Sequence, residues 1–166
     1  TAAVSFLIKV PLEKDALYLS DLKPLKSFAH GGPNYDRDYG GEVAQIGDRV
    51  YPKCVMVCPE PSPDGTHGQV VYALPQEKGP LTLHAEVGIE ETAKTNGSAV
   101  FMVQTAASPD GPWETLYTSP TMRGGAEPAA VKVPLGAAKY LRLYTTDAGD
   151  GINSDHALWG SARLKW

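Results

Sequence analysis

The chain has 166 residues and a formal net charge of −4, and its charged residues of both signs are mixed along the sequence. No Lys- or Arg-rich run occurs, so we expect no nucleic-acid partner. No apolar run approaches the length of a membrane span, so we expect no membrane insertion. The 17 glycines and 14 prolines indicate many turns rather than long helices.

The length suits one domain with a substantial core. We interpret residues 1–17 as an N-terminal strand or linker, because Val4–Val10 is apolar and fits either. The domain itself is predicted over residues 18–166. The chain begins with Thr1 rather than methionine, which indicates a processed product or an excised domain, and no signal peptide is visible.

The first half of the chain alternates between loops and strands. Ser27–Gly41 is rich in glycine and aspartate, which predicts a long ordered loop. Val50–Cys58 reads as one strand, residues 59–68 as a Pro- and Gly-containing loop, and Gln69–Leu74 as a short strand. On an extended strand Cys54 and Cys58 would lie about 13 Å apart, which is too far for a disulfide. We therefore predict two buried free thiols.

The second half is strand-rich. Leu81–Ile89 alternates cleanly and places every second residue, beginning with Leu81, on one face. Ser98–Thr105 is apolar on both faces, as in a central strand, and Ser108–Trp113 predicts a hairpin turn. Further strands are expected at 129–135, 140–146 and 158–165. The pattern predicts an all-β fold, an antiparallel β-sandwich of jelly-roll type. We expect both termini to lie close together, since the opening and closing strands of such sandwiches are often neighbours.

The loop between the last two strands is acidic and contains Gly149 and Gly151, which can adopt positive φ without steric cost. Its oxygen-bearing side chains allow two interpretations. In one, Asp147, Asp150 and Asp155 bind calcium together with backbone carbonyls. In the other, the aspartates cap their own backbone turns and bind no ion.

No recognised catalytic constellation is present. The chain lacks a Gly-x-Ser-x-Gly elbow and a His-Glu-x-x-His motif, and its four histidines are scattered. Acidic pairs such as Glu90-Glu91 and Asp36/Asp38 are more simply polar loop ends than a pair for glycoside hydrolysis. We therefore predict that the chain is not an enzyme, and a small glycosidase remains a weaker alternative.

Several motifs, in order, resemble the NPCBM family, the "novel putative carbohydrate-binding module", also counted as carbohydrate-binding module family 51. The most specific is Asp147–Ala157 followed by Trp159; Tyr18–Leu22, Tyr35–Arg37, Tyr51–Lys53 and Val87–Glu91 match in the same order. The resemblance covers about residues 18–164. Cys58 stands near where this family has a histidine, unless His67 fills that place.

The resemblance implies a β-sandwich that binds terminal galactose-type sugars, with calcium associated in relatives. It also implies covalent linkage to a secreted glycan-active protein, and hence an extracellular or periplasmic location. The runner-up interpretation is a structural or protein-interaction sandwich that has lost sugar binding.

A sugar site needs an aromatic face and planar polar groups that bind hydroxyls at fixed angles. Two loops supply these groups, and we predict that they lie side by side. The predicted ligand-binding residues are Tyr35, Asp36, Arg37, Tyr39, Asn153 and His156. Arg37 would bond adjacent hydroxyls, His156 another hydroxyl, and Tyr35 or Tyr39 would cover the ring. Trp159 and Trp113 are expected to pack structurally.

Overall fold

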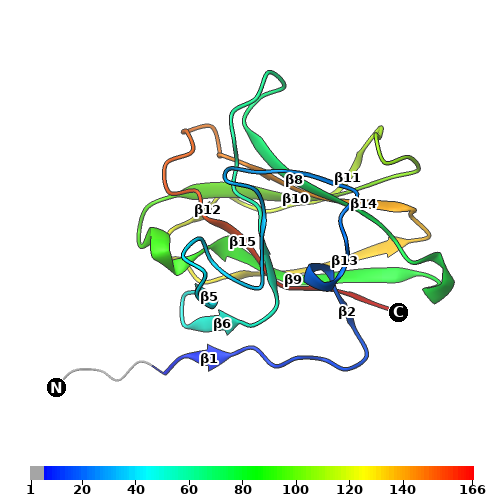
Figure 1. The fold of residues 1–166 in the computed structure, drawn as a ribbon, viewed down its shortest axis with the longest axis horizontal. Coiled ribbons are helices and arrows are strands. Elements are labelled where there is room, and N and C mark those ends of the chain that lie inside the picture. Colours follow the sequence, from blue (N-terminus) through cyan, green and yellow to red (C-terminus); the bar gives the residue numbers. More distant parts are fainter. Residues whose placement is uncertain (1–5) are drawn as a thin grey trace.

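The structure, a computed structural model, describes residues 6–166. Two antiparallel sheets pack face to face as the predicted β-sandwich of jelly-roll type (Figure 1). The strands are β1 (Ile8–Lys9), β2 (Leu17–Tyr18), β3 (Lys26–Phe28), β4 (Asn34–Tyr35), β5 (Ala44–Ile46), β6 (Arg49–Tyr51), β7 (Cys54–Met56), β8 (His67–Ala73), β9 (Leu81–Ile89), β10 (Ser98–Ala106), β11 (Glu114–Thr118), β12 (Met122–Arg123), β13 (Ala129–Gly136), β14 (Tyr140–Thr146) and β15 (Ala157–Lys165). Three 3-10 turns complete the described elements, η1 (Leu19–Asp21), η2 (Gln76–Lys78) and η3 (Glu91–Ala93).

The first sheet has the order β11-β10-β14-β8-β3, with β12 pairing β10. The second sheet has the order β13-β9-β15-β7-β4, with β2 pairing β15. The strand that opens the domain, β2, therefore lies beside the strand that closes it, β15, which is the reason given for neighbouring termini, although the N-terminus itself lies outside the described residues. A small third sheet, β1-β6-β5, contains the parallel pair β1 and β6, which departs from the antiparallel pattern.

The main core lies between the two large sheets. The predicted face of β9, every second residue from Leu81 to Ile89, is buried in it. Trp159 on β15 is fully buried and meets Phe101 on β10 edge to face, with ring centroids 5.3 Å apart. Aromatic pairs favour this geometry, so the predicted core role of Trp159 is confirmed.

A second core lies on the other face of the second sheet, beneath the small β1-β6-β5 sheet. Ile46 and Tyr51 contribute fully buried side chains to it. Both depend on glycines opposite them, because a Cβ on Gly160 would lie 2.6 Å from the Tyr51 ring and one on Gly88 would lie 2.8 Å from Ile46. Glycine at these two positions therefore lets the third layer sit close to the sheet.

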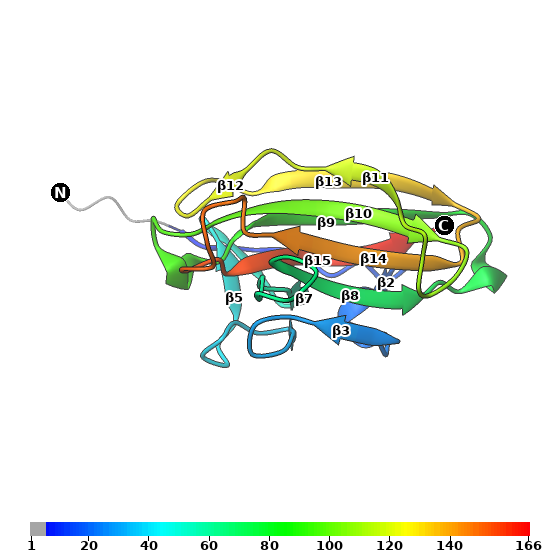
Figure 2. The ribbon, with the colours of Figure 1, turned by 90° about the horizontal axis from the view of Figure 1, so that it is seen from above.

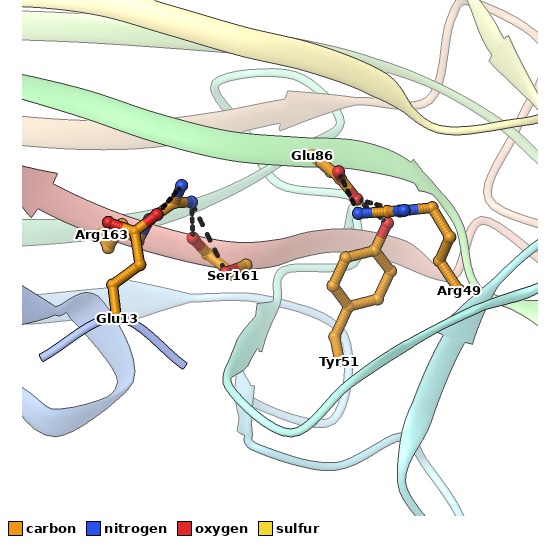
Figure 3. A network of polar contacts seen from close by, with 6 residues as sticks. All are labelled: Glu13, Arg49, Tyr51, Glu86, Ser161 and Arg163. Carbon is orange, nitrogen blue, oxygen red and sulfur yellow. Dashed lines mark hydrogen bonds and ion pairs between the residues drawn. The ribbon is translucent and has the colours of Figure 1, made fainter. Parts of the chain in front are cut away.

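A polar network closes the edge of this second core (Figure 3). The Arg49 guanidinium donates two hydrogen bonds of 2.7 Å to the Glu86 carboxylate on β9, and the Tyr51 hydroxyl donates to the same carboxylate. Forked pairing of this kind fixes orientation as well as charge. The small sheet is thus held by packing at its centre and by ion pairing at its rim.

The segment before β2 is tied to the last strand in the same way (Figure 3). The Glu13 carboxylate accepts a 2.7 Å hydrogen bond from Arg163 and lies 2.8 Å from the Lys165 ammonium. These two cations lower the pKa of Glu13 from its ordinary 4.5 to about 2. Of the apolar segment Val4–Val10, residues 4 and 5 lie outside the described part and β1 takes up residues 8 and 9.

Two local predictions need correction, and a third is confirmed. Val50–Cys58 is not one strand, because the chain leaves the ladder at Pro52 and resumes as β7. Ser27–Gly41 is not wholly loop, because it contains the end of β3 and all of β4. The predicted free, buried state of Cys54 and Cys58 is confirmed, since each is 4% exposed or less and neither forms a disulfide.

Gly160→Ala tests the packing of the third layer. The added Cβ would overlap the buried Tyr51 ring, so we expect a loss of about 1–3 kcal/mol in the free energy of unfolding, the usual cost of overpacking. Urea denaturation measures this loss. Gly40→Ala is the control, because Gly40 does not have a positive φ and a Cβ added there would lie 3.4 Å from its nearest neighbour, Asp38 Oδ1. A wild-type midpoint for Gly160→Ala would contradict the packing argument.

Glu13→Gln tests the ion pairing. Because folding lowers the pKa of Glu13, its stabilisation is fully present above pH 4.5 and is lost as the pH falls toward 2. We expect the variant to lose about 1 kcal/mol or less at pH 7, since solvent screens this partly exposed group, and to approach the wild type near pH 2. Urea unfolding at several pH values measures the difference. Equal losses for Glu13→Gln and for Glu77→Gln, on an exposed turn, would contradict this.

Candidate functional site

The loop between β14 and β15 lies at the same end of the sandwich as η3 and β12 (Figure 2). This final loop, residues 147–156, rests directly on the start of β10. A Cβ on Gly97 would lie only 2.0 Å from the Ser154 carbonyl oxygen, and Gly97 has φ +84°. Glycine is therefore required here both for close approach and for backbone conformation.

A pocket of about 440 Å³ opens beside the final loop. Its volume lies in the range of small-molecule sites. Its walls come from three parts of the chain, and the lining residues are His30, Tyr39, Cys58, Pro59, Ile152, Asn153, Ser154, Asp155 and His156. The pocket thus brings together the Ser27–Gly41 segment and the final loop, the two segments that the sequence analysis placed side by side.

Tyr39 supplies the aromatic group of the pocket. Its ring meets the His156 ring edge to face, with centroids 5.0 Å apart, and 39% of the residue is exposed. The Tyr39 hydroxyl donates a 3.0 Å hydrogen bond to the His30 carbonyl oxygen. Burial raises the pKa of this hydroxyl above its ordinary value, so it remains protonated at neutral pH. The ring is therefore held in place while part of its surface stays accessible.

A hydrogen-bond chain sets the state of His156. Thr92 donates its hydroxyl proton to the buried Glu90 carboxylate, so its oxygen, 2.9 Å from His156 Nδ1, must accept from the ring. Burial lowers the pKa of His156 below 6.5, which leaves the ring neutral at pH 7. A neutral ring that donates through Nδ1 carries its free lone pair on Nε2. His156 is therefore prepared to accept a hydrogen bond.

Asp155 anchors the final loop from below. It is 3% exposed, and its Oδ1 accepts a 2.8 Å hydrogen bond from the backbone amide of Ser98. Its Oδ2 is buried and has no partner among residues 6–166. Burial raises the pKa of Asp155 to about 6. Asp155 lines the pocket and fixes its floor to β10.

The other residues predicted on the Ser27–Gly41 segment do not line this pocket. Tyr35 packs against the main core, and its hydroxyl is buried. Asp36 lies 3.0 Å from the Lys53 ammonium and accepts a hydrogen bond from the Cys54 amide. The Arg37 side chain is exposed and forms no hydrogen bond or ion pair with residues 6–166. The structure thus gives Tyr35 and Asp36 structural contacts, because alternate residues of β4 and the turn after it point in different directions.

Tyr39, Asn153 and His156 are the predicted ligand-binding residues that line the pocket. The lining residues that were not predicted from the sequence are His30, Cys58, Pro59, Ile152 and Ser154. His30 could have been found, since it shares the Gly- and Asp-rich segment with Tyr39. The placement of Cys58 and Pro59 depends on how β7 continues past Met56, which sequence alone does not show. Burial raises the pKa of the Cys58 thiol to about 11.

Asp38 stabilises the turn that carries Tyr39, a role that was not predicted from the sequence. It is 5% exposed, and its Oδ1 accepts hydrogen bonds from the amides of Gly40 and Glu42 at 2.8 and 2.9 Å. These bonds close the turn that carries Tyr39, as short aspartate side chains often do.

The three aspartates predicted to bind calcium do not gather around one point. Among residues 6–166, no group of three histidine, cysteine, aspartate or glutamate side chains is arranged to hold a metal ion. Asp147 accepts from the amides of Gly149 and Gly151, which is the turn-capping alternative, and Asp150 accepts from the Ser98 hydroxyl. The three carboxylates thus have separate partners in this structure, and calcium binding stays a prediction.

A family model for the NPCBM/NEW2 domain matches residues 15–165. The chain belongs to this family. The resemblance found in its sequence is therefore confirmed. The chain is also 30% identical to a Renibacterium salmoninarum protein named as an endo-alpha-N-acetylgalactosaminidase. The match covers 99% of this chain but only 10% of that protein, so the NPCBM chain corresponds to one small part of it.

Solved structures agree with the family. A CBM51 module from a Clostridium perfringens GH95 protein, in complex with methyl-galactose, matches with a TM-score of 0.74 and 26% identity, covering 90% of this chain and 99% of that one. A Clostridium perfringens ZmpB structure with an M60 catalytic domain and two CBM51 domains matches with a TM-score of 0.73 and 29% identity, over 90% of this chain and 15% of that one. Family 51 relatives thus occur as modules within larger proteins.

The calcium prediction is tested by heat denaturation with and without a chelator. An ion that binds only the folded state raises the melting temperature, so we expect added calcium to raise it and the chelator to lower it. Asp155→Asn should abolish that difference, because Asp155 holds the only predicted ligand oxygen that is buried and free. Glu77→Gln serves as the control for removal of a distant carboxylate. If the melting curves with calcium and with chelator are identical and elemental analysis finds no calcium, the calcium prediction is wrong. The aspartates of the final loop then only cap turns.

Proposed function

We propose that this NPCBM domain is a non-catalytic carbohydrate-binding module that binds a terminal galactose-type sugar in the pocket beside the final loop. The observation that carries the proposal is the pairing of Tyr39 with His156, which puts an accessible aromatic ring and a fixed hydrogen-bond acceptor in one pocket. The similarity to a module solved with methyl-galactose supports the choice of sugar.

Each pocket group has a defined task in this proposal. The Tyr39 ring packs against the apolar face of the pyranose, and His156 Nε2 accepts a hydrogen bond from a sugar hydroxyl. The Asn153 amide has both donors and an acceptor, so it can bond a second hydroxyl in either direction. Because hydrogen bonds have preferred angles, these groups together select sugars by the orientation of their hydroxyls.

The pocket is suited to binding rather than to hydrolysis. Among its described lining residues, Asp155 is the only carboxylate. Hydrolysis of a glycosidic bond uses two carboxyl groups on opposite sides of that bond. Asp155 also accepts a hydrogen bond from the Ser98 amide through Oδ1, which gives it a structural contact. This supports the non-catalytic assignment over the alternative of a small glycosidase.

We further propose that this module is covalently linked to a secreted glycan-active protein. The support is the modular setting of the relatives, in which the matching part is a small share of a long chain. Among residues 6–166, no helix has the length and apolar character to cross a membrane. We place the protein outside the cell or in the periplasm, where such glycans occur.

His156→Ala tests the proposed site. Loss of one polar partner of a bound hydroxyl should weaken binding of methyl-galactoside by about five- to a hundred-fold. Protonation of Nε2 removes the acceptor, so wild-type affinity should also fall as the pH drops below 6.5. Calorimetric titration measures both effects.

His84→Ala, on the outer face of β9, is the matched control and should keep wild-type affinity. The melting temperature of each variant shows whether it folds. If a glycan array and titration detect no sugar bound to the wild type, with or without calcium, the domain is instead an interaction module that has lost sugar binding.

A further inference from the structure

A second pocket of about 250 Å³ lies on the other side of the final loop. Its polar lining side chains are Thr95, Ser98, Arg123, Asp150 and Asn153. Asn153 lines both pockets, so the two are separated by little more than this part of the final loop. A ligand that fills the first pocket and is longer than one sugar unit can therefore reach the second by passing over Asn153.

The walls of the second pocket are fixed by backbone contacts. Arg123 stands opposite Ser98 in the pairing of β12 with β10. The turn after Arg123 packs tightly on the segment before β10, since a Cβ on Gly124 would lie 1.9 Å from the Asn96 carbonyl oxygen. On the opposite wall, the Ser98 hydroxyl holds the Asp150 carboxylate at 2.7–2.8 Å. The Asp150 carboxylate and the backbone that carries Arg123 are therefore held in place, which reduces the entropy lost on binding.

The charges of this pocket indicate what it can accept. The Arg123 guanidinium forms no ion pair or hydrogen bond with residues 6–166, so its five donors are available. The Asp150 carboxylate offers acceptors on the facing wall, and its negative charge opposes an anionic ligand. One cation and one anion together suit a neutral ligand rich in hydroxyl groups. The described lining holds no aromatic side chain for stacking, so this pocket extends a site rather than forming one alone.

We propose that the second pocket binds the next, uncharged sugar unit of a glycan whose terminal unit occupies the first pocket. Arg123 donates a forked pair of hydrogen bonds to its hydroxyls, as the guanidinium geometry favours, and Asp150 accepts from another hydroxyl. This inference rests on the proposed function of the first pocket. It names the ligand as a neutral oligosaccharide rather than a single sugar.

The test compares methyl-galactoside with a panel of neutral galactose-terminated di- and trisaccharides by calorimetric titration. We expect the wild type to bind at least one oligosaccharide about five-fold or more tightly than methyl-galactoside, the effect of one or two added hydrogen bonds. Arg123→Ala should reduce the affinity for that oligosaccharide to the level of the affinity for the monosaccharide. The affinity for methyl-galactoside should stay unchanged. Lys132→Ala, which removes an exposed cation on β13, should change neither.

The outcomes separate the two proposals. If methyl-galactoside binds and no oligosaccharide binds more tightly than it does, the second pocket is not a sugar site. The proposal for the first pocket is then unaffected. A larger gain for sialylated or sulfated glycans than for neutral ones would overturn the neutral assignment. Loss of methyl-galactoside binding in a folded Arg123→Ala would show that the pockets are not separate. If the wild type binds neither class of ligand, both proposals fail together.

Discussion

The placement of β15 is the constraint on which the rest of the molecule depends. This strand pairs with β9, β7 and β2, so it joins the centre of the second sheet to the start of the domain. Its Trp159 fills the main core against Phe101, while Gly160, the next residue, leaves room for Tyr51 in the second core. Because His156 immediately precedes β15, the register that packs Trp159 also fixes where His156 stands in the pocket.

Buried carboxylates help to hold the pocket in shape. Asp38, Glu90 and Asp155 are each at least nine-tenths buried, and each accepts hydrogen bonds from backbone amides of the loops around the pocket. Such bonds to a charged acceptor are stronger than those between neutral groups. Loops fixed in this way lose little further freedom on binding a sugar, which matters for a ligand that offers little apolar surface.

The aromatic groups elsewhere are used differently. On the outer face of the first sheet, His67 stacks on Tyr144 with ring centroids 5.3 Å apart, and Arg142 lies over the rings of both Tyr144 and Trp113. These ring faces are covered by one another and by the guanidinium. The structural role expected for Trp113 agrees with this contact. Tyr39, by contrast, keeps part of its ring exposed beside polar groups, which is why the pocket rather than the sheet face suits a sugar.

The sequence alone determined the class of fold and most of its strands, because alternation of apolar residues with period two and the glycine- and proline-rich turns are local properties. The strand at Leu81–Ile89 and its buried face were predicted in full, and the family motif at Asp147–Ala157 marked the loop that carries the pocket. Local alternation does not show which residues face the core where a strand breaks its own pattern. The bulge in β15, with Ser161 at φ 51°, turns Ala162 and Leu164 to the core where simple alternation from Trp159 would have placed Ser161 and Arg163.

Only the tertiary structure decided which polar residues share the pocket. Asp36, Arg37 and Tyr39 look equivalent in the sequence, yet Asp36 is bound by Lys53 and Cys54, Arg37 points to solvent, and Tyr39 reaches His156. The same holds for the aspartates of the final loop. Asp147 caps a turn, Asp150 accepts from the Ser98 hydroxyl, and Asp155 accepts from the Ser98 amide. The physical reason is that a side chain's partners come from strands distant in sequence, and sheet pairing, not local composition, sets which of them it meets.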